Sequence, residues 1–234
     1  SSVLLMGGCV QPTLAPNINH SIKNILAKLH IEVRESSQSE CCGALDQHLA
    51  ASNDALKKVK RNIDHWISQL DSGVEAIISS ASGCGVMIKD YPNLFEESDS
   101  YYEKALLVSS KTKDIAEFLA NKDLSMLNLK ELNISYHEPC TMQHGQKLGG
   151  LVESILSDFG YIKKTVKDSH ICCGSAGTYS IFETKIANQL RSEKIENLNA
   201  SKPKMIVTSN IGCLMHLQKG SSIPVKHWVE LLDV

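Results

Sequence analysis

The eight cysteines of this chain form two sets of four with nearly the same spacing. The sets are Cys9, Cys41, Cys42, Cys84 and Cys140, Cys172, Cys173, Cys213. The first three members of the first set precede their counterparts by 131 residues, and Cys84 precedes Cys213 by 129. A nearly constant offset indicates an internal repeat. The chain therefore consists of two related halves that place their cysteines in equivalent positions.

Residues around the cysteines repeat as well. The tripeptide CCG occurs at 41–43 and 172–174, and IISSASGC at 77–84 matches IVTSNIGC at 206–213. We predict three regions, namely a first CCG repeat over 1–95, a helical connector over 96–131 and a second CCG repeat over 132–234. The segment 101–120 within the connector is expected to be helical.

Short apolar runs alternate with longer amphipathic segments in both halves, which is typical of strands alternating with helices. We expect strands near 3–6, 31–35, 75–80, 134–136, 161–166 and 204–209. An amphipathic helix follows each CCG tripeptide, with a stripe from Leu56 to Leu70 in the first half and a segment over about 183–199 in the second. The predicted fold class is α/β, with two pseudo-repeated halves that each hold a small, mainly parallel sheet flanked by helices.

Every cysteine loop follows a predicted strand. The carboxyl ends of parallel strands lie at one edge of a sheet, so four thiols can meet there in each half. Four thiolates suit an all-cysteine zinc site or an iron–sulfur cluster. The chain has no C-x2-C knuckle, and adjacent cysteines suit a multi-iron cluster better than a single ion. Structural disulfides are a weaker alternative, because nothing in the sequence indicates an oxidising compartment.

Eight segments carry a specific resemblance and run along almost the whole chain. They are GCVQP (8–12), ECCGAL (40–45), ASGCG (81–85), YHEPC (136–140), QHGQ (143–146), CCGSAGTY (172–179), NIGC (210–213) and PVKHW (224–228). The chain resembles the cysteine-rich CCG domain found in heterodisulfide reductases and in iron–sulfur subunits of flavin-linked dehydrogenases. It is most similar to the C-terminal part of glycolate oxidase (glycolate dehydrogenase) iron–sulfur subunits.

The resemblance implies an electron-transfer subunit of an oxidoreductase that acts on CH–OH groups. Such a subunit passes electrons from FAD-containing dehydrogenase subunits to a membrane quinone acceptor, and the isolated chain is expected to be inactive. The implied cofactor is an iron–sulfur cluster of the 4Fe–4S type, including the non-cubane form, with all eight cysteines as ligands. The resemblance also implies an upstream ferredoxin-type segment. The implied location is the cytoplasm, at the inner face of the cytoplasmic membrane.

The sequence departs from the fuller family motif, which has a fifth cysteine three residues before the last one. Ala81 and Asn210 stand at these positions. The cluster therefore differs, or another ligand completes it, or one or both halves hold zinc. Two further functions stay open: a thiol/disulfide redox module of the heterodisulfide reductase kind, and a zinc-stabilised docking domain without redox activity.

Two histidines flank Cys140 and are candidates for hydrogen bonding to cluster sulfurs or for a proton route. They are His137, which replaces Met6 of the first half, and His144. His48, His216 and His227 are expected to be structural. With 24 basic and 26 acidic side chains, the composition argues against a nucleic-acid partner.

Overall fold

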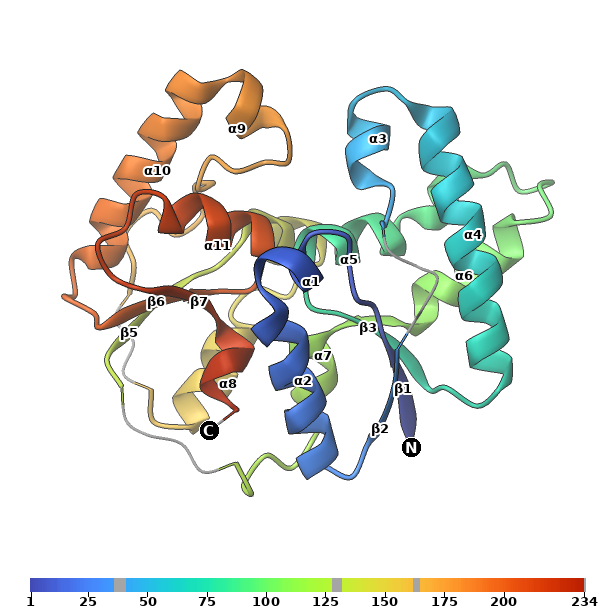
Figure 1. Ribbon diagram of the computed structural model, residues 1–234, viewed down its shortest axis with the longest axis horizontal. Helices are drawn as coiled ribbons and strands as arrows, with labels where there is room; N and C mark the ends of the chain where they lie inside the picture. Colours follow the sequence, from blue (N-terminus) through green and yellow to red (C-terminus); the bar gives the residue numbers. More distant parts are fainter. Residues whose placement is uncertain (36–40, 128–131, 162–164, 234) are drawn as a thin grey trace. The chain divides into compact units, whose positions relative to one another are not determined.

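The computed structural model describes residues 1–35, 41–127, 132–161 and 165–233. The chain divides into two compact units, Ser1–Leu124 and Ser125–Val234. Both are layered structures of parallel strands and helices (Figure 1).

The first unit contains a four-stranded parallel sheet in the order β2-β1-β3-β4. Its strands are β1 (Ser2–Leu5), β2 (Glu32–Glu35), β3 (Ala76–Ser79) and β4 (Thr112–Asp114). All residues of β1 and β3 are buried, and Leu4 pairs with Ile77 in the register between them. Apolar side chains on both faces of these central strands are typical of a parallel sheet covered by helices.

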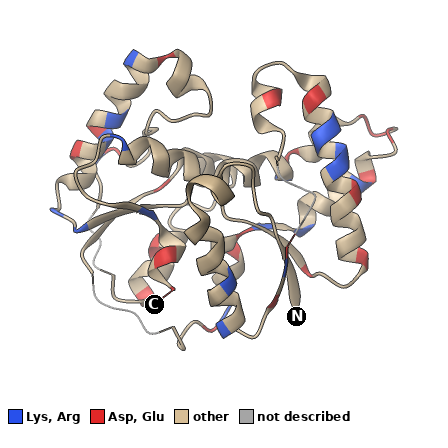
Figure 2. Ribbon diagram, viewed as in Figure 1, with Lys and Arg blue, Asp and Glu red and all other residues tan. Residues whose placement is uncertain are grey.

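Helices surround this sheet and provide most of the core. They are α1 (Gln11–Leu14), α2 (Pro16–Lys28), α3 (Ala44–His48), α4 (Ser52–Asp71), α5 (Ser82–Lys89), η1 (Tyr91–Leu94), α6 (Tyr102–Lys111) and α7 (Ile115–Leu119). The stripe predicted over 56–70 forms part of α4, where Val59, Ile63 and Trp66 are buried. Trp66 stacks on Tyr91 with ring centroids 6.2 Å apart. The other face of α4 carries charges of both signs (Figure 2).

The second unit contains a three-stranded parallel sheet in the order β5-β6-β7. Its strands are β5 (Ile134–His137), β6 (Met205–Thr208) and β7 (Val225–His227). Its helices are η2 (Thr141–Gly145, a π-helix), α8 (Leu151–Asp158), α9 (Tyr179–Phe182), α10 (Thr184–Asn199), α11 (Ile211–Gln218) and η3 (Trp228–Leu231). The strand predicted near 161–166 lies partly outside the described residues, and β7 was not predicted.

The segment 101–120, which was expected to be helical, contains a short strand between two helices. It contains α6, then β4, then α7, and β4 pairs with β3 as an edge strand of the first sheet. A capping box explains the break, because the Asp114 side chain accepts a hydrogen bond from Ala116 N while that of Glu117 accepts one from Asp114 N. This part of the expected connector thus belongs to the first compact unit, whereas residues 128–131 lie outside the described part.

The predicted fold class is confirmed, since both halves are α/β units built on parallel sheets. In the part of the chain that the structure describes, no helix is both long and apolar enough to cross a bilayer.

Candidate metal centre

The thiols of each unit lie on loops and helix starts that follow the strands. In the first unit, Cys9 lies between β1 and α1, the Cys41–Cys42 pair comes after β2, and Cys84 is the third residue of α5 after β3. Parallel strands bring their carboxyl ends to one edge, so loops far apart in sequence meet there. Because each cysteine of the first unit follows a strand of a parallel sheet, its three cysteine loops are expected to meet at one edge of that sheet.

The thiols of the first unit lie close enough to interact with one another in a chain. Cys9 contacts Cys41, Cys41 contacts Cys42, and Cys42 contacts Cys84. Hydrogen bonds from Cys42 and Cys9 lower the pKa of the Cys41 thiol to about 2, while the contact with Cys41 raises the pKa of Cys42 and of Cys9. A hydrogen bond from Cys42 lowers the pKa of the Cys84 thiol as well. The thiolate is thus favoured at Cys41 and Cys84, and the thiolate is the state that binds a metal.

The second unit repeats this arrangement. Cys140 contacts Cys172, Cys172 contacts Cys173, and Cys173 contacts Cys213. Hydrogen bonds from Cys140 and Cys173 lower the pKa of the Cys172 thiol to about 2, whereas the contact with Cys172 raises the pKa of Cys140. All eight cysteines are free thiols, so the described structure contains no disulfide in place of these contacts.

Backbone N–H groups donate hydrogen bonds to the paired cysteines of each CCG tripeptide. Gly174 N donates to Cys172 Sγ over 3.3 Å, and Ser175 N donates to Cys173. Gly43 and Ala44 make the same donations to Cys41 and Cys42 in the first unit. In each unit four sulfurs neighbour one another in a chain, and N–H groups donate to the two central sulfurs. Such a donor set fits a soft metal or a cluster with sulfur ligands.

The glycine of each CCG tripeptide adopts a left-handed conformation, with φ of +86° at Gly43 and +89° at Gly174. The two positions differ in the space around them. A Cβ on Gly174 would lie 2.5 Å from the carbonyl oxygen of Ala187 in α10, whereas the closest atoms to a Cβ on Gly43 are 3.4 Å away. The second CCG loop therefore packs more closely against α10 than the first CCG loop packs against α4.

Buried polar side chains hold the first CCG loop. Asn62 of α4 donates to the carbonyl oxygen of Cys41 over 2.9 Å and to Tyr91 Oη over 3.2 Å. Tyr91 in turn donates to the carbonyl oxygen of Cys42 over 3.0 Å. Both side chains are fully buried, so these bonds fix the thiol-bearing backbone within the core.

We expect Tyr91→Phe to lower the free energy of unfolding by about 1–2 kcal/mol, because the buried carbonyl of Cys42 loses its donor. Tyr101→Phe is the matched control, since its hydroxyl donates to Asp64 at the exposed surface, and it should cost less than about 0.5 kcal/mol. Urea unfolding followed by the fluorescence of Trp66 in a Trp228→Phe background measures both. Equal losses in the two variants would contradict this role of Tyr91.

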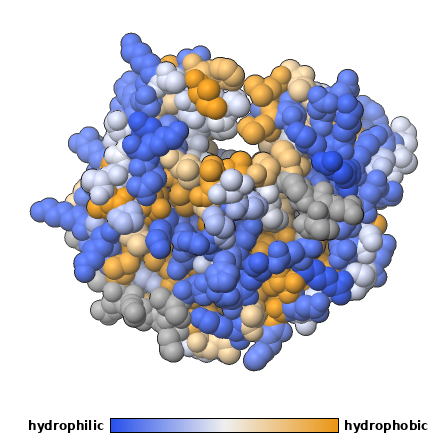
Figure 3. Space-filling model, in the orientation of Figure 1, coloured by the Kyte–Doolittle hydropathy of each residue, from blue (hydrophilic) through white to orange (hydrophobic). Residues whose placement is uncertain are grey.

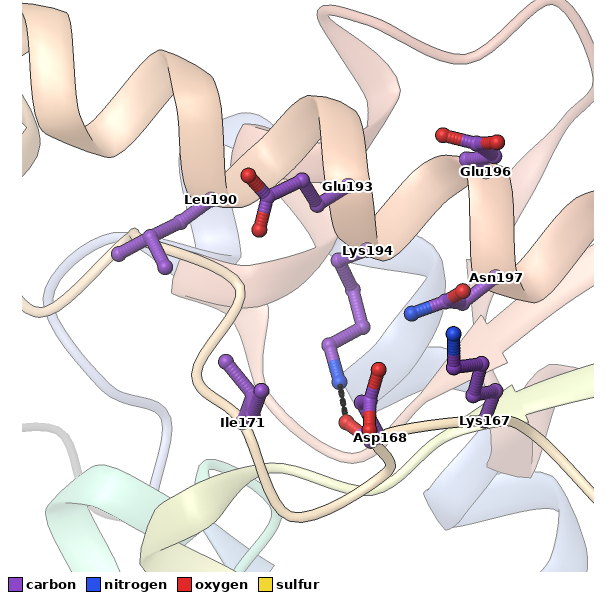
Figure 4. A pocket seen from close by; sticks show the side chains of 8 residues that line it. All are labelled: Lys167, Asp168, Ile171, Leu190, Glu193, Lys194, Glu196 and Asn197. Atoms are coloured by element: carbon purple, nitrogen blue, oxygen red, sulfur yellow. Dashed lines mark hydrogen bonds between the residues drawn. The ribbon is translucent and has the colours of Figure 1, made fainter.

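In the second unit a lysine takes the place of Asn62, at an offset of 132 residues. Lys194 of α10 is 3% exposed and donates to the carbonyl oxygen of Asp168 over 2.6 Å (Figure 4). It also donates to the carbonyl oxygen of Ser169 over 3.4 Å. Gln143 also donates to Ser169, over 3.2 Å. Burial lowers the pKa of Lys194, but its charge interacts favourably with Cys173 and Cys172. The loop before Cys172 is therefore held by a cation close to the thiols.

The two candidate histidines, His137 and His144, differ in burial. His137, at the end of β5, is 3% exposed, and burial lowers its pKa to about 3. His144 lies in η2 and is exposed. His216 contacts the carbonyl oxygen of Ala187 over 3.2 Å, and His227 accepts from Val229 N at the start of η3. Of the pair flanking Cys140, His137 is thus the one buried beside the thiols.

The model of the cysteine-rich CCG domain matches this chain twice, over residues 3–89 and 134–218. Each match includes all four cysteines of one unit. The chain belongs to the cysteine-rich CCG domain family. The predicted resemblance is confirmed, and the internal repeat consists of two copies of this domain.

Proteins similar to this chain include iron–sulfur subunits of glycolate oxidases. The glycolate oxidase iron-sulfur subunit of Escherichia coli (strain K12) is 42% identical over 99% of this chain and 57% of its own length. A probable glycolate oxidase iron-sulfur subunit of Bacillus subtilis (strain 168) is 27% identical over 93% of this chain and 49% of its own length. Lactate utilization protein A of the same organism is 25% identical over 99% of this chain and 98% of its own. The chain thus spans about half the length of the two glycolate oxidase subunits.

Sequence reasoning did not identify Asn62, Tyr91, Gln143 or Lys194 as parts of the site. A signal existed for two of them, because Asn62 and Lys194 occupy matching positions in the long helix after each CCG tripeptide. A polar residue on the apolar face of such a helix is worth attention, since a buried polar group requires a partner.

Proposed function

We propose that this chain is the cluster-binding part of an iron–sulfur electron-transfer subunit in a flavin-dependent glycolate oxidase. The observation that carries the proposal is the chain of four neighbouring free thiols in each unit, with N–H donors to its central sulfurs. The identity of 42% with the Escherichia coli subunit supports glycolate as the substrate of the complex.

The proposed ligands are the four cysteines of each unit, and the proposed cofactor is a 4Fe–4S cluster in each. A cluster bound there would accept and release single electrons. The chain supplies the thiolates, the N–H donors that offset negative charge on sulfur, and the buried ammonium of Lys194. Hydrogen bonds and nearby cations favour the more negative, reduced state.

A flavin-containing partner would bind close to the thiols. Each unit exposes apolar side chains on the short helix that follows its CCG tripeptide, with Leu45 and Leu49 around α3 and Ile181 and Phe182 in α9 (Figure 3). Phe182 is 69% exposed. We propose that FAD-containing subunits deliver electrons here, and that the acceptor is a quinone in the cytoplasmic membrane, reached from its inner face.

Electron delivery is tested with the complete iron–sulfur subunit, expressed with its flavin partner and purified anaerobically. Addition of glycolate should bleach the visible absorption of the clusters and produce their reduced EPR signal. The iron–sulfur subunit without its flavin partner should show neither change. Reduction by glycolate without the partner, or no reduction with it, would contradict the proposed function.

A further inference from the structure

The second thiol site includes a nitrogen donor as well as sulfur. A ring nitrogen of His137 and the Sγ atoms of Cys173 and Cys213 all lie within 4.8 Å of one another, and all three residues are buried. Ligand atoms of one metal site lie at such separations. His137 is thus at coordinating range of the same centre as the thiols.

A second contact fixes the imidazole ring. His137 Nδ1 lies 3.0 Å from the hydroxyl of Thr208, its register partner in the neighbouring strand β6. Thr208 is fully buried, so this contact is shielded from water. A histidine that binds a metal through one nitrogen generally engages the other in a hydrogen bond that sets the tautomer. Nε2 is therefore the nitrogen left to bind.

The two units differ at this position. Both residues lie three before the first cysteine of their set, but the first unit has Met6 where the second has His137. Met6 belongs to the apolar core cluster of the first unit, which also includes Cys42, Trp66 and Ile77. The first site thus has an apolar thioether where the second has an imidazole held by a hydroxyl.

We propose that His137 is a direct ligand of the metal centre in the second unit, through Nε2 and beside Cys173 and Cys213. The second centre is then bound by sulfur and nitrogen and the first by thiol sulfur. This inference rests on the proposed role of the thiols as ligands. It adds a ligand that makes the two centres chemically unequal.

Pulsed EPR of the cluster-loaded chain tests the inference. The chain carries Cys41→Ser to confine the metal to the second unit, and only its histidines are labelled with nitrogen-15. We expect a nitrogen coupling that changes from the 14N to the 15N pattern on labelling, disappears in His137→Met and persists in His144→Gln. A histidine coupling that survives in His137→Met, or none in the parent chain, would overturn the proposal.

Zinc provides a test that does not depend on a cluster or on the proposed electron transfer. X-ray absorption of the same Cys41→Ser chain loaded with zinc alone should show about one nitrogen at about 2.0–2.1 Å among sulfurs at about 2.3 Å. His137→Met should leave only sulfur. If no iron or sulfide binds, the proposed function fails, yet the nitrogen in the zinc shell still decides the role of His137. An all-sulfur shell in the parent chain would reject that role.

Discussion

Cys172→Ser is expected to remove about half of the iron from the anaerobically purified chain, and Cys41→Ser is expected to remove the other half. A serine hydroxyl stays protonated at neutral pH, so it does not replace a thiolate that ligates a soft metal. Cys41 and Cys172 each lie in the middle of a chain of four thiols, in contact with two other cysteines. The two sites belong to separate compact units, so the losses should add in the double variant.

The control for these variants is His20→Gln, since His20 is an exposed residue of α2. Its iron content should equal that of the parent chain. Iron and labile sulfide are measured per chain, together with the EPR signal that remains in each variant. Loss of all iron in either single variant would mean one shared site, and no loss in either would mean that these thiols are not ligands.

Gly174→Ala is expected to destabilise the second unit by about 3 kcal/mol or more. The left-handed φ of +89° costs an alanine about 1–2 kcal/mol, and overpacking adds about 1–3 kcal/mol. The added Cβ would lie 2.5 Å from a backbone oxygen of α10, which flexible side-chain motion does not relieve. The loop that carries Cys172 and Cys173 would then move away from α10.

Two matched variants separate backbone strain from the close approach. Gly43→Ala has a similar φ of +86° but nothing closer than 3.4 Å, so only the strain of about 1–2 kcal/mol applies. Gly7→Ala meets nothing within 4 Å and should be nearly neutral. Trp66 and Trp228 are buried in the first and second unit, so a Trp66→Phe background reports on the second unit and Trp228→Phe on the first. Equal losses in Gly174→Ala and Gly43→Ala would contradict the packing argument.

The sequence predicted the features that depend on regular spacing. The constant offset of the cysteines and the apolar runs before them predicted parallel sheets with thiols at one edge, because strand direction and side-chain order follow from local pattern. The α4 stripe with Val59, Ile63 and Trp66 was predicted for the same reason. The assignment of all eight cysteines as ligands stays a prediction, which the iron content of Cys41→Ser and Cys172→Ser tests.

Features that depend on non-local pairing were not predicted. The three residues of β4 are buried or half-buried beside β3, and a segment this short shows no alternation that distinguishes it from the helices around it. The role of Lys194 depends on two carbonyl oxygens 25 and 26 residues away in the chain. His137 was recognised as a candidate, but its position beside Cys173 and Cys213 required the pairing of β5 with β6.

Metal and sulfide analysis of the anaerobically purified chain, combined with EPR of oxidised and reduced samples, distinguishes iron–sulfur clusters from zinc in the two units. Two 4Fe–4S clusters require about eight iron and about eight labile sulfide per chain, with a signal that changes on reduction. We expect this result, with zinc near zero. About two zinc ions per chain without labile sulfide would contradict it and would identify both units as structural zinc sites.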